Sequence, residues 1–173
     1  MHLVSCTEAR HAGAILDIFN EAIVNSTALY DYKPRALETM APWFATKRAN
    51  AFPVIGMEED DGGLLGFATY GTFRAWPAYK YTVEHSIYID ARYRGAGLGR
   101  KLLEQLIVKA GEQGVHAMVG GIDVENSASI ALHSRLDFEH AGTIREVAFK
   151  FGRWRDLAFF QRILETPLHP ADG

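Results

Sequence analysis

"RYRGAGLGRKLLEQLI", residues 92–107, places three glycines within five positions and then continues with the spacing of an amphipathic helix. Each glycine costs conformational entropy, so a loop that needed one tight turn would need only one of them. A mobile turn explains the stretch without any function. A loop whose backbone approaches a phosphate explains it as well, because the free N–H groups and the dipole of a helix N-terminus favour anions.

The glycine spacing excludes two common phosphate-binding motifs. The dinucleotide-binding pattern needs a glycine three positions after Gly97, where Arg100 stands. The P-loop ends in Gly-Lys followed by Ser or Thr, whereas this loop ends in Gly99-Arg100-Lys101. What remains is an R-x-x-G-x-G signature that runs from Arg94 to Gly99.

Composition limits the class of protein. The chain has 173 residues, 48% apolar and 23% charged, which is ordinary for one globular domain covering 1–173 with a disordered tail from about residue 166. A net charge of −3 favours neither nucleic acid nor an anionic membrane as partner. The single cysteine, Cys6, cannot form an internal disulfide. Without a signal peptide or an apolar run of about twenty residues, we expect a cytoplasmic protein.

The hydrophobic pattern predicts an α/β domain without internal repeats. One helix should follow Thr7 as its N-cap, and a second, over 35–50, should turn Leu37, Met40, Trp43 and Phe44 inward. Two more helices are expected from residue 98 to near Gly114 and over 126–136. Strands are expected at 2–6, 52–57, 64–73, 81–89, 116–122, 138–149 and 154–164.

The loop from Arg94 to Gly99 resembles the pyrophosphate-binding loop of the GNAT superfamily of N-acetyltransferases, which bind acetyl-CoA. Its context fits this resemblance, because a strand precedes the loop, a long helix follows it, and a helix headed by Asn126 comes one strand later. The resemblance implies a mixed, twisted central sheet flanked by helices, with acetyl-CoA as co-substrate.

A narrower resemblance covers nearly the whole chain. "TVEHSIYI", the glycine loop, "ENSASIALHSRLDFEHAG" and "FKFGRWRDLAFFQ" occur in the order found in bacterial phosphinothricin and methionine sulfoximine acetyltransferases. The substrate loop "FRAWPAYKYTVEHS" departs from the phosphinothricin enzymes, which tend to carry a lysine and an arginine–asparagine pair there. Arg74 followed by an aromatic residue is more similar to the methionine sulfoximine and sulfone branch.

This resemblance implies an acyltransferase that detoxifies a small amino-acid analogue. Its α-amine would attack acetyl-CoA directly in a ternary complex, and strand N–H groups would stabilise the oxyanion. The resemblance also implies a homodimer. "FKFGRWRDLAFF" reads as an edge strand and turn with exposed Phe, Trp and Arg, a composition that suits an interface.

Two residues are candidates for the chemistry. Glu84 lies in an apolar strand, either on an exposed edge or as the general base that deprotonates the substrate ammonium; the resemblance favours the base. By the same resemblance, His133 stands where many superfamily members have a tyrosine that protonates the CoA thiolate and where phosphinothricin-type enzymes have a histidine, as here. A half-buried structural histidine, with water as the proton donor, remains the alternative.

The remaining candidates bind cofactor or substrate. Acetyl-CoA would contact Ile87, Tyr88, Ile89, Arg94, Gly95, Ala96, Gly97, Leu98, Gly99, Arg100, Asn126 and Ser129. The substrate would contact Arg74, Ala75, Trp76, Glu84, His85 and Ser86. Arg74 offers a fork for an α-carboxylate, although most arginines are surface charges.

Several residues also have structural interpretations. Strand alternation sends His85 to the face opposite Glu84, where we expect it to be packed rather than functional. Ile87, Tyr88 and Ile89 are expected in the core. Trp76, Tyr30 and Tyr32 can wall the pocket, or belong to the core or a dimer interface. Cys6 is expected to be packed, which argues against a covalent cysteine mechanism, and no residue spacing suggests a metal.

Two other functions stay open on the sequence alone. The same fold could acetylate a protein N-terminus or a polyamine, although a polyamine site should hold several carboxylates and residues 72–86 offer one. A sensor that binds acetyl-CoA without chemistry would keep the glycine loop. Glu84 and His133 both argue against the sensor.

Overall fold

The computed structural model describes residues 1–172. Its contacts group the chain into two compact units. Unit 1 contains residues 1–69 and 86–106, and unit 2 contains residues 70–85 and the chain from Ile107 onward. The strands over residues 64–72 and 82–89 and the helix over residues 98–112 each have residues in both units.

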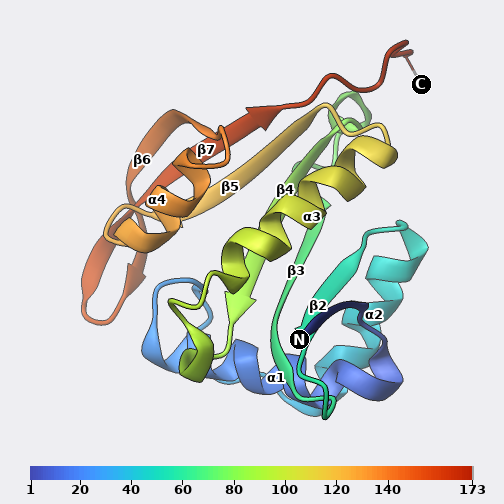
Figure 1. The fold of residues 1–173 in the computed structure, drawn as a ribbon. Coiled ribbons are helices and arrows are strands. Elements are labelled where there is room, and N and C mark those ends of the chain that lie inside the picture. Colours follow the sequence, from blue (N-terminus) through green and yellow to red (C-terminus); the bar gives the residue numbers. More distant parts are fainter. Residues whose placement is uncertain (173) are drawn as a thin grey trace. The chain divides into compact units, whose positions relative to one another are not determined.

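The strands follow one hydrogen-bonded order, β1-β2-β3-β4-β5-β7-β6 (Figure 1). Pairing is parallel between β4 and β5 and antiparallel in β1–β2, β2–β3, β5–β7 and β6–β7, so the expected mixed sheet is confirmed. The strands are β1 His2–Ser5, β2 Val54–Glu58, β3 Leu64–Thr72, β4 Thr82–Ile89, β5 Ala117–Asp123, β6 Glu139–Lys150 and β7 Arg153–Ile163.

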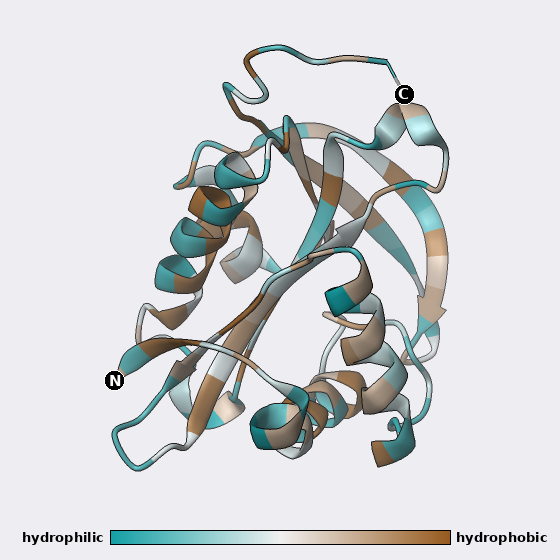
Figure 2. Cartoon of the chain, turned by 90° about the vertical axis from the view of Figure 1, so that its right-hand side faces the viewer, coloured by the Kyte–Doolittle hydropathy of each residue, from teal (hydrophilic) through white to brown (hydrophobic). Residues whose placement is uncertain are grey.

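The helices carry hydrophobic and hydrophilic residues on different sides, visible as alternating brown and teal bands in Figure 2. They are α1 Glu8–Asn25, α2 Met40–Ala49, α3 Leu98–Glu112 and α4 Ser127–Ser134, with single 3-10 turns at Leu37–Thr39, Pro77–Tyr79 and Ala91–Tyr93. All four expected helices are confirmed, but the second begins at Met40 rather than near residue 35. The prediction that Leu37 lies on the inner side of this helix is therefore wrong. Leu37 lies in a 3-10 turn, whose tighter winding changes the direction of its side chain, and it is 59% exposed.

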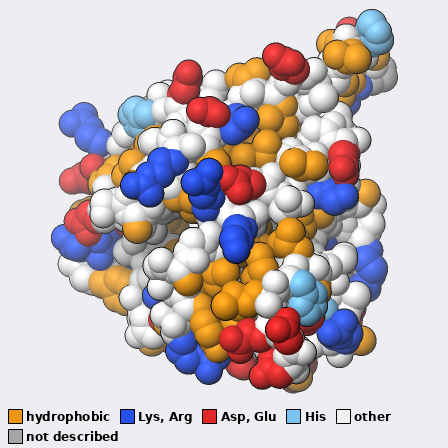
Figure 3. Space-filling view, in the orientation of Figure 1, with side chains coloured by type: hydrophobic (Ala, Val, Ile, Leu, Met, Phe, Trp, Pro, Cys, Tyr) orange, Lys and Arg blue, Asp and Glu red, His pale blue; other side chains and the backbone are white. Residues whose placement is uncertain are grey.

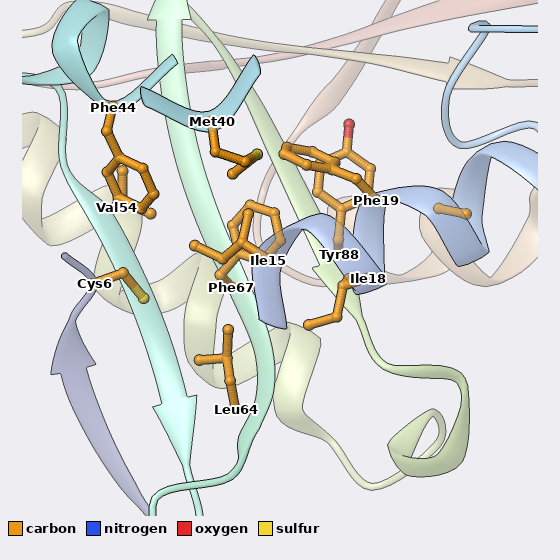
Figure 4. Packing of buried hydrophobic residues seen from close by; sticks show 11 residues of the cluster. Cys6, Ile15, Ile18, Phe19, Met40, Phe44, Val54, Leu64, Phe67 and Tyr88 are labelled. Carbon is orange, nitrogen blue, oxygen red and sulfur yellow. The ribbon is translucent and has the colours of Figure 1, made fainter. Parts of the chain in front are cut away.

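The core of unit 1 forms where α1 packs its apolar face on neighbouring strands (Figure 4). Ile15, Ile18 and Phe19 of α1 are buried, and the Phe19 ring meets the ring of Phe67 edge-on at 5.1 Å between centroids. Tyr88 of β4 joins the same cluster, with its ring 5.1 Å from that of Phe19. The β4 segment that precedes the glycine loop is thus held by aromatic packing.

The start of α1 differs from the expectation. Thr7 is the N-cap residue, but its side chain makes no capping hydrogen bond. Instead, the Thr7 N–H donates to Nδ1 of His11 at 2.8 Å. Nε2 of His11 donates in turn to a carboxylate oxygen of Glu58 on β2 at 2.7 Å, and both side chains are buried.

Unit 2 is built on β5, β7 and β6, which lie side by side in Figure 1. Beta strand β6 is the outermost strand and forms a long hairpin with β7. The hairpin exposes large apolar side chains, namely Ile144, Val147, Phe149, Phe151 and Trp154. The exposed Phe and Trp side chains expected for this segment are confirmed.

Charges of both signs are interspersed on the face drawn in Figure 3, with hydrophobic side chains between them. That face carries no field of a single sign. Within residues 1–172, none of the helices combines the length and the apolar character that a membrane span requires.

Candidate active site

The glycine loop joins β4 to α3 within unit 1. Gly95 and Gly97 have φ angles of +81° and +78°, which side chains other than glycine rarely adopt. A Cβ added at either position would meet no atom within 4 Å. The loop therefore needs these glycines for its backbone angles and leaves their surroundings open, which suits the approach of a large anionic ligand.

The arginines of the loop are already paired with carboxylates. The Arg94 guanidinium forms an ion pair with Glu21, and its Nε donates to the Ile89 carbonyl at 3.3 Å. Arg100 donates to Glu104 at 2.7 Å. The first N–H groups of α3 have no acceptor within the helix and remain as anion donors.

The three residues expected to pair with the pantetheine differ in burial. Tyr88 is buried at 9% exposure, whereas Ile87 and Ile89 are only half-buried, so the expectation that all three are core residues is wrong for two of them. Alternation along β4 explains the difference, since Ile87 and Ile89 share one face and Tyr88 takes the other.

Glu84 and His85 lie on opposite faces of β4, in unit 2. Adjacent glycines on β5 establish this, because the Cβ positions of Gly120 and Gly121 must point to opposite faces. A Cβ on Gly121 would lie 3.2 Å from Oε1 of Glu84. A Cβ on Gly120 would lie 2.9 Å from Cε1 of His85. The predicted alternation is confirmed: Glu84 is exposed and His85 is buried.

The Glu84 carboxyl is partly shielded from solvent, and its pKa reflects this. Partial burial raises its pKa, and the positive charge of Arg74 acts in the opposite direction. A raised pKa makes the carboxylate a better proton acceptor near neutral pH. Glu84, the predicted base, and Arg74, the predicted ligand of the substrate carboxylate, are thus close enough to influence one another.

His133 contacts His85 rather than Glu84. Its Nε2 lies 2.9 Å from Nε2 of His85, and its Nδ1 lies 2.7 Å from the carbonyl oxygen of Ser129. Both rings are buried, at 6% exposure for His85 and 5% for His133. Asn126 caps α4 by accepting the Ser129 N–H at 3.1 Å. The predicted N-cap is confirmed, and Asn126, Ser129 and His133 lie along one side of α4.

The residues predicted to bind substrate are mostly exposed. Arg74 and Ala75 lie at the surface of unit 2, with the Arg74 guanidinium 5.5 Å from the Phe73 ring centre. Trp76 is 73% exposed and Tyr32 is 74% exposed, so neither belongs to the core. Ser86 is half-buried. Their contacts with substrate stay a prediction.

Cysteine chemistry finds no support. Cys6 is buried, and burial raises the pKa of its thiol to about 12, with Glu58 adding to the effect. Its reactive thiolate form is therefore scarce at neutral pH. Within the described chain, no three His, Cys, Asp or Glu side chains are grouped as metal ligands. The expectation that no metal takes part stays a prediction.

Sequence reasoning missed Gly120 and Gly121. They lie in the middle of β5, where each leaves room for a side chain from β4. The signal was present, because glycine inside a strand often marks close approach of another group. Sequence reasoning also missed Phe138, whose ring lies 5.1 Å from both His85 and His133.

The chain resembles known proteins over most of its length. The model of the acetyltransferase (GNAT) family matches residues 15–138. An L-methionine sulfoximine/L-methionine sulfone acetyltransferase from Pseudomonas aeruginosa is 43% identical over 151 residues, 87% of this chain and 88% of the relative.

Solved structures agree with the sequence relatives. An acetyltransferase structure from Acinetobacter baylyi has 61% identity and a TM-score of 0.98, covering 99% of this chain and 96% of that one. A Salmonella typhimurium acetyltransferase solved with its cofactor acetyl-CoA has 36% identity and a TM-score of 0.94, covering 99% and 98%. With its glycine loop, mixed sheet and matching family model, this chain belongs to the acetyltransferase (GNAT) family and is an N-acetyltransferase.

Proposed function

We propose that this N-acetyltransferase transfers the acetyl group of acetyl-CoA to the α-amine of a small amino acid of the methionine sulfoximine and methionine sulfone type. The observation that carries the proposal is the exposed Glu84 carboxylate with Arg74 close enough to affect its pKa. One side chain can accept a proton from an ammonium group, and the other can bind an α-carboxylate. The similarity to the Pseudomonas aeruginosa enzyme supports this substrate class.

The glycine loop supplies the second half of the proposal. The open backbone at Gly95 and Gly97 and the free N–H groups at the start of α3 suit the pyrophosphate of acetyl-CoA. Residues 87–89 precede the loop on β4 and would offer backbone groups to the pantetheine and acetyl amides. The Salmonella typhimurium relative, solved with acetyl-CoA, supports this use of the fold.

The reaction proceeds by direct attack in a ternary complex. Glu84, itself or through a water molecule, accepts a proton from the substrate ammonium and frees the nitrogen lone pair. The nitrogen bonds to the acetyl carbonyl carbon, and backbone N–H groups of the strand stabilise the oxyanion. The carbon–sulfur bond then breaks, the nitrogen releases its second proton to solvent to give the neutral amide, and the sulfur leaves as a thiolate that takes up one proton.

The first test measures CoA thiol release with a panel of amines: methionine sulfoximine, methionine sulfone, phosphinothricin, spermidine and a peptide with a free N-terminus. We expect turnover with the first two and a loss of about 10²–10⁴-fold in kcat for Glu84→Gln. Glu139→Gln, an exposed carboxylate on β6, is the matched control and should be neutral. Turnover only with spermidine or the peptide would reassign the substrate, and acetyl-CoA binding without turnover would indicate a sensor.

Arg74 gives a test of the substrate carboxylate. Arg74→Gln should raise KM for methionine sulfone by about tenfold or more. The same variant should leave KM for methionine sulfone amide unchanged, because that amide lacks the carboxylate. Equal effects on both compounds would remove Arg74 from substrate binding.

The pH dependence follows from the raised pKa of Glu84. The base is active when deprotonated, so kcat/KM should fall as the pH drops through a value above the ordinary 4.5 of a glutamate. Arg74→Gln should shift this limb to higher pH, since it removes the charge that lowers the pKa of Glu84. A limb that does not move would argue against Glu84 as the titrating base.

We also propose a homodimer formed through the hairpin of β6 and β7. Phe149 and Trp154 are exposed on this hairpin at 45% and 59%, and their rings contact one another at 5.3 Å. Aromatic residues of this kind are enriched at interfaces. Trp154→Asp should convert a dimer into a monomer in sedimentation equilibrium, whereas a monomeric wild-type protein would contradict the proposal.

A further inference from the structure

The buried pair His85–His133 allows only certain arrangements of protons. Two nitrogens 2.9 Å apart form a hydrogen bond only if one carries a proton and the other a lone pair. Nδ1 of His133 lies 2.7 Å from the Ser129 carbonyl oxygen and 3.4 Å from the Ser129 hydroxyl. The carbonyl is the closer partner and can only accept, so Nδ1 of His133 is the donor of that hydrogen bond. Nδ1 of His133 therefore carries a proton.

The state of the second nitrogen follows from the surroundings of the rings. Phe138 lies against both rings, and Phe160 lies 6.5 Å from the ring of His133. Glu84, the neighbouring carboxylate on β4, points to the opposite face. No carboxylate is thus among these contacts to balance a positive charge on His133.

Burial lowers the pKa of His133. The pKa of His85 is lowered to about 3, mainly by burial and secondly by electrostatic repulsion between the two rings when both are protonated. Backbone contacts at Ser129 and Val119 act in the opposite direction for His133 and His85, respectively. A neutral His133 with a proton on Nδ1 has a bare Nε2, which must accept from Nε2–H of His85. Nδ1 of His85 is then a bare nitrogen, and this buried atom has no hydrogen-bond partner among the described residues.

The opposite arrangement costs more. If Nε2 of His85 were bare, His133 would have to carry protons on both nitrogens and bury a positive charge. Nδ1 of His85 would then carry a buried N–H, and the nearby backbone of Val119 does not reach it with the geometry of a hydrogen bond. Burying an uncompensated charge is far more costly than leaving one ring nitrogen without a donor.

We infer that His85 is a positioning residue that holds His133 as a neutral ring protonated on Nδ1, so that the pair ties β4 to α4 and supplies no proton to the departing thiolate. Both N–H protons of the pair are already in hydrogen bonds: Nδ1–H of His133 donates to the Ser129 carbonyl, and Nε2–H of His85 donates to Nε2 of His133. The proton on the thiolate then comes from water. The statement about the thiolate rests on the proposed function, whereas the proton arrangement does not.

The direct test is long-range ¹H–¹⁵N correlation NMR on protein labelled with ¹⁵N-histidine, between pH 8 and pH 5. The spectra of His85→Gln and His133→Gln assign the two rings among the seven histidines. We expect His133 protonated on Nδ1, His85 protonated on Nε2, and neither ring charged over this range. A cationic ring at pH 7, or His133 protonated on Nε2, would overturn the inference.

A pair of His85 variants tests whether His85 acts through His133. Glutamine at position 85 keeps an N–H donor for Nε2 of His133, whereas His85→Leu removes it. Loss of a hydrogen bond to the neutral ring should raise the pKa of His133 by about one in His85→Leu, and glutamine should restore the low value. Equal titration of His133 in both variants would contradict the positioning role. Acetyl-CoA binding measured by calorimetry checks that both variants are folded.

Activity separates the inference from the proposed function. His133→Gln keeps an acceptor for His85 but cannot donate an acidic proton. We expect kcat to fall less than tenfold, whereas loss of a general acid would cost 10²-fold or more. Such a loss in a folded, acetyl-CoA-binding variant would overturn the inference. If no amine in the panel is acetylated, the proposed function fails while the NMR spectra still decide the proton arrangement.

Discussion

Two buried histidines, one near the start of α1 and one near the end of α4, use Nδ1 in opposite ways: one accepts a hydrogen bond and the other donates one. His11 lies in the first turn of α1, where the free backbone groups are N–H donors, and its Nδ1 accepts the Thr7 N–H. His133 lies in the last turn of α4, and its Nδ1 donates to the carbonyl oxygen of Ser129, one turn earlier in the same helix. The backbone group that each Nδ1 meets fixes the tautomer of the ring.

The tautomer in turn decides which partner each ring needs. His11 has its proton on Nε2 and donates it to the carboxylate of Glu58. His133 has a bare Nε2 and requires a donor, which His85 provides. A carboxylate beside Nε2 of His133 would repel it, so a second histidine is the better partner. The two sites show why a buried histidine cannot be interpreted from its sequence context alone.

The largest effect is expected at the first site. Glu58→Ala leaves the buried Nε2–H of His11 without an acceptor and should lower the free energy of unfolding by about 3 kcal/mol. Glu58→Gln keeps an oxygen acceptor and should cost about 1 kcal/mol. Urea denaturation of both variants measures the difference. Equal losses would mean that the hydrogen bond to His11 contributes little.

The second site, the pair His85–His133, can be disturbed by a substitution on β5. Gly120→Ala places a Cβ 2.9 Å from Cε1 of His85 and 3.1 Å from Nε2 of His133, so a ring must move. We expect a loss of about 2 kcal/mol in the free energy of unfolding, measured by urea denaturation. Gly13→Ala in α1 is the control: its Cβ would meet nothing within 4 Å, and alanine should stabilise the helix by up to about 1 kcal/mol. A stable Gly120→Ala variant would show that the rings have room to shift.

The two sites should also differ in their pH dependence. The pKa of His85 is lowered from the ordinary 6.5 to about 3, so its contribution to stability is complete above pH 6.5 and is lost as the pH falls towards 3. The hydrogen bond from His11 lowers the pKa of Glu58, with burial opposing and Arg10 assisting, so that contribution is lost only below the ordinary 4.5.

Urea denaturation at pH 7, 6 and 5 separates these windows. The wild-type protein should lose up to about 1.4 kcal/mol per pH unit for each histidine held neutral, and His85→Leu should flatten this slope. Glu58→Gln should leave the slope between pH 7 and pH 5 unchanged. His140→Gln, an exposed histidine, is the control. An unchanged slope in His85→Leu would argue against a neutral buried ring.

The smallest effect is expected at the N-cap of α1. An N-cap threonine that makes its hydrogen bond is worth about 1 kcal/mol, but the Thr7 side chain makes none. Thr7→Ala should therefore change the free energy of unfolding by less than about 0.5 kcal/mol, because no side-chain hydrogen bond is lost and the N–H of residue 7 can still donate to His11. A thermal shift corresponding to 1 kcal/mol would restore the threonine as the cap.

The sequence by itself determined the features that depend on local pattern. The glycine loop, the order of strands and helices, the cap at Asn126 and the alternation of Glu84 and His85 all follow from backbone periodicity and turn chemistry. The resemblance of the glycine loop and its flanking motifs gave the family. Helix ends were less certain, and Leu37 was misplaced because a 3-10 turn precedes α2.

Only the tertiary structure decided what the buried polar groups do. His133 stood out in the sequence as a proton donor, yet its partner lies 48 residues away on β4. His11 and Glu58 were not noticed, because their contact spans 47 residues and neither stands in a motif. Protonation and hydrogen bonding depend on which groups meet in the folded core, and that information is not present in local sequence.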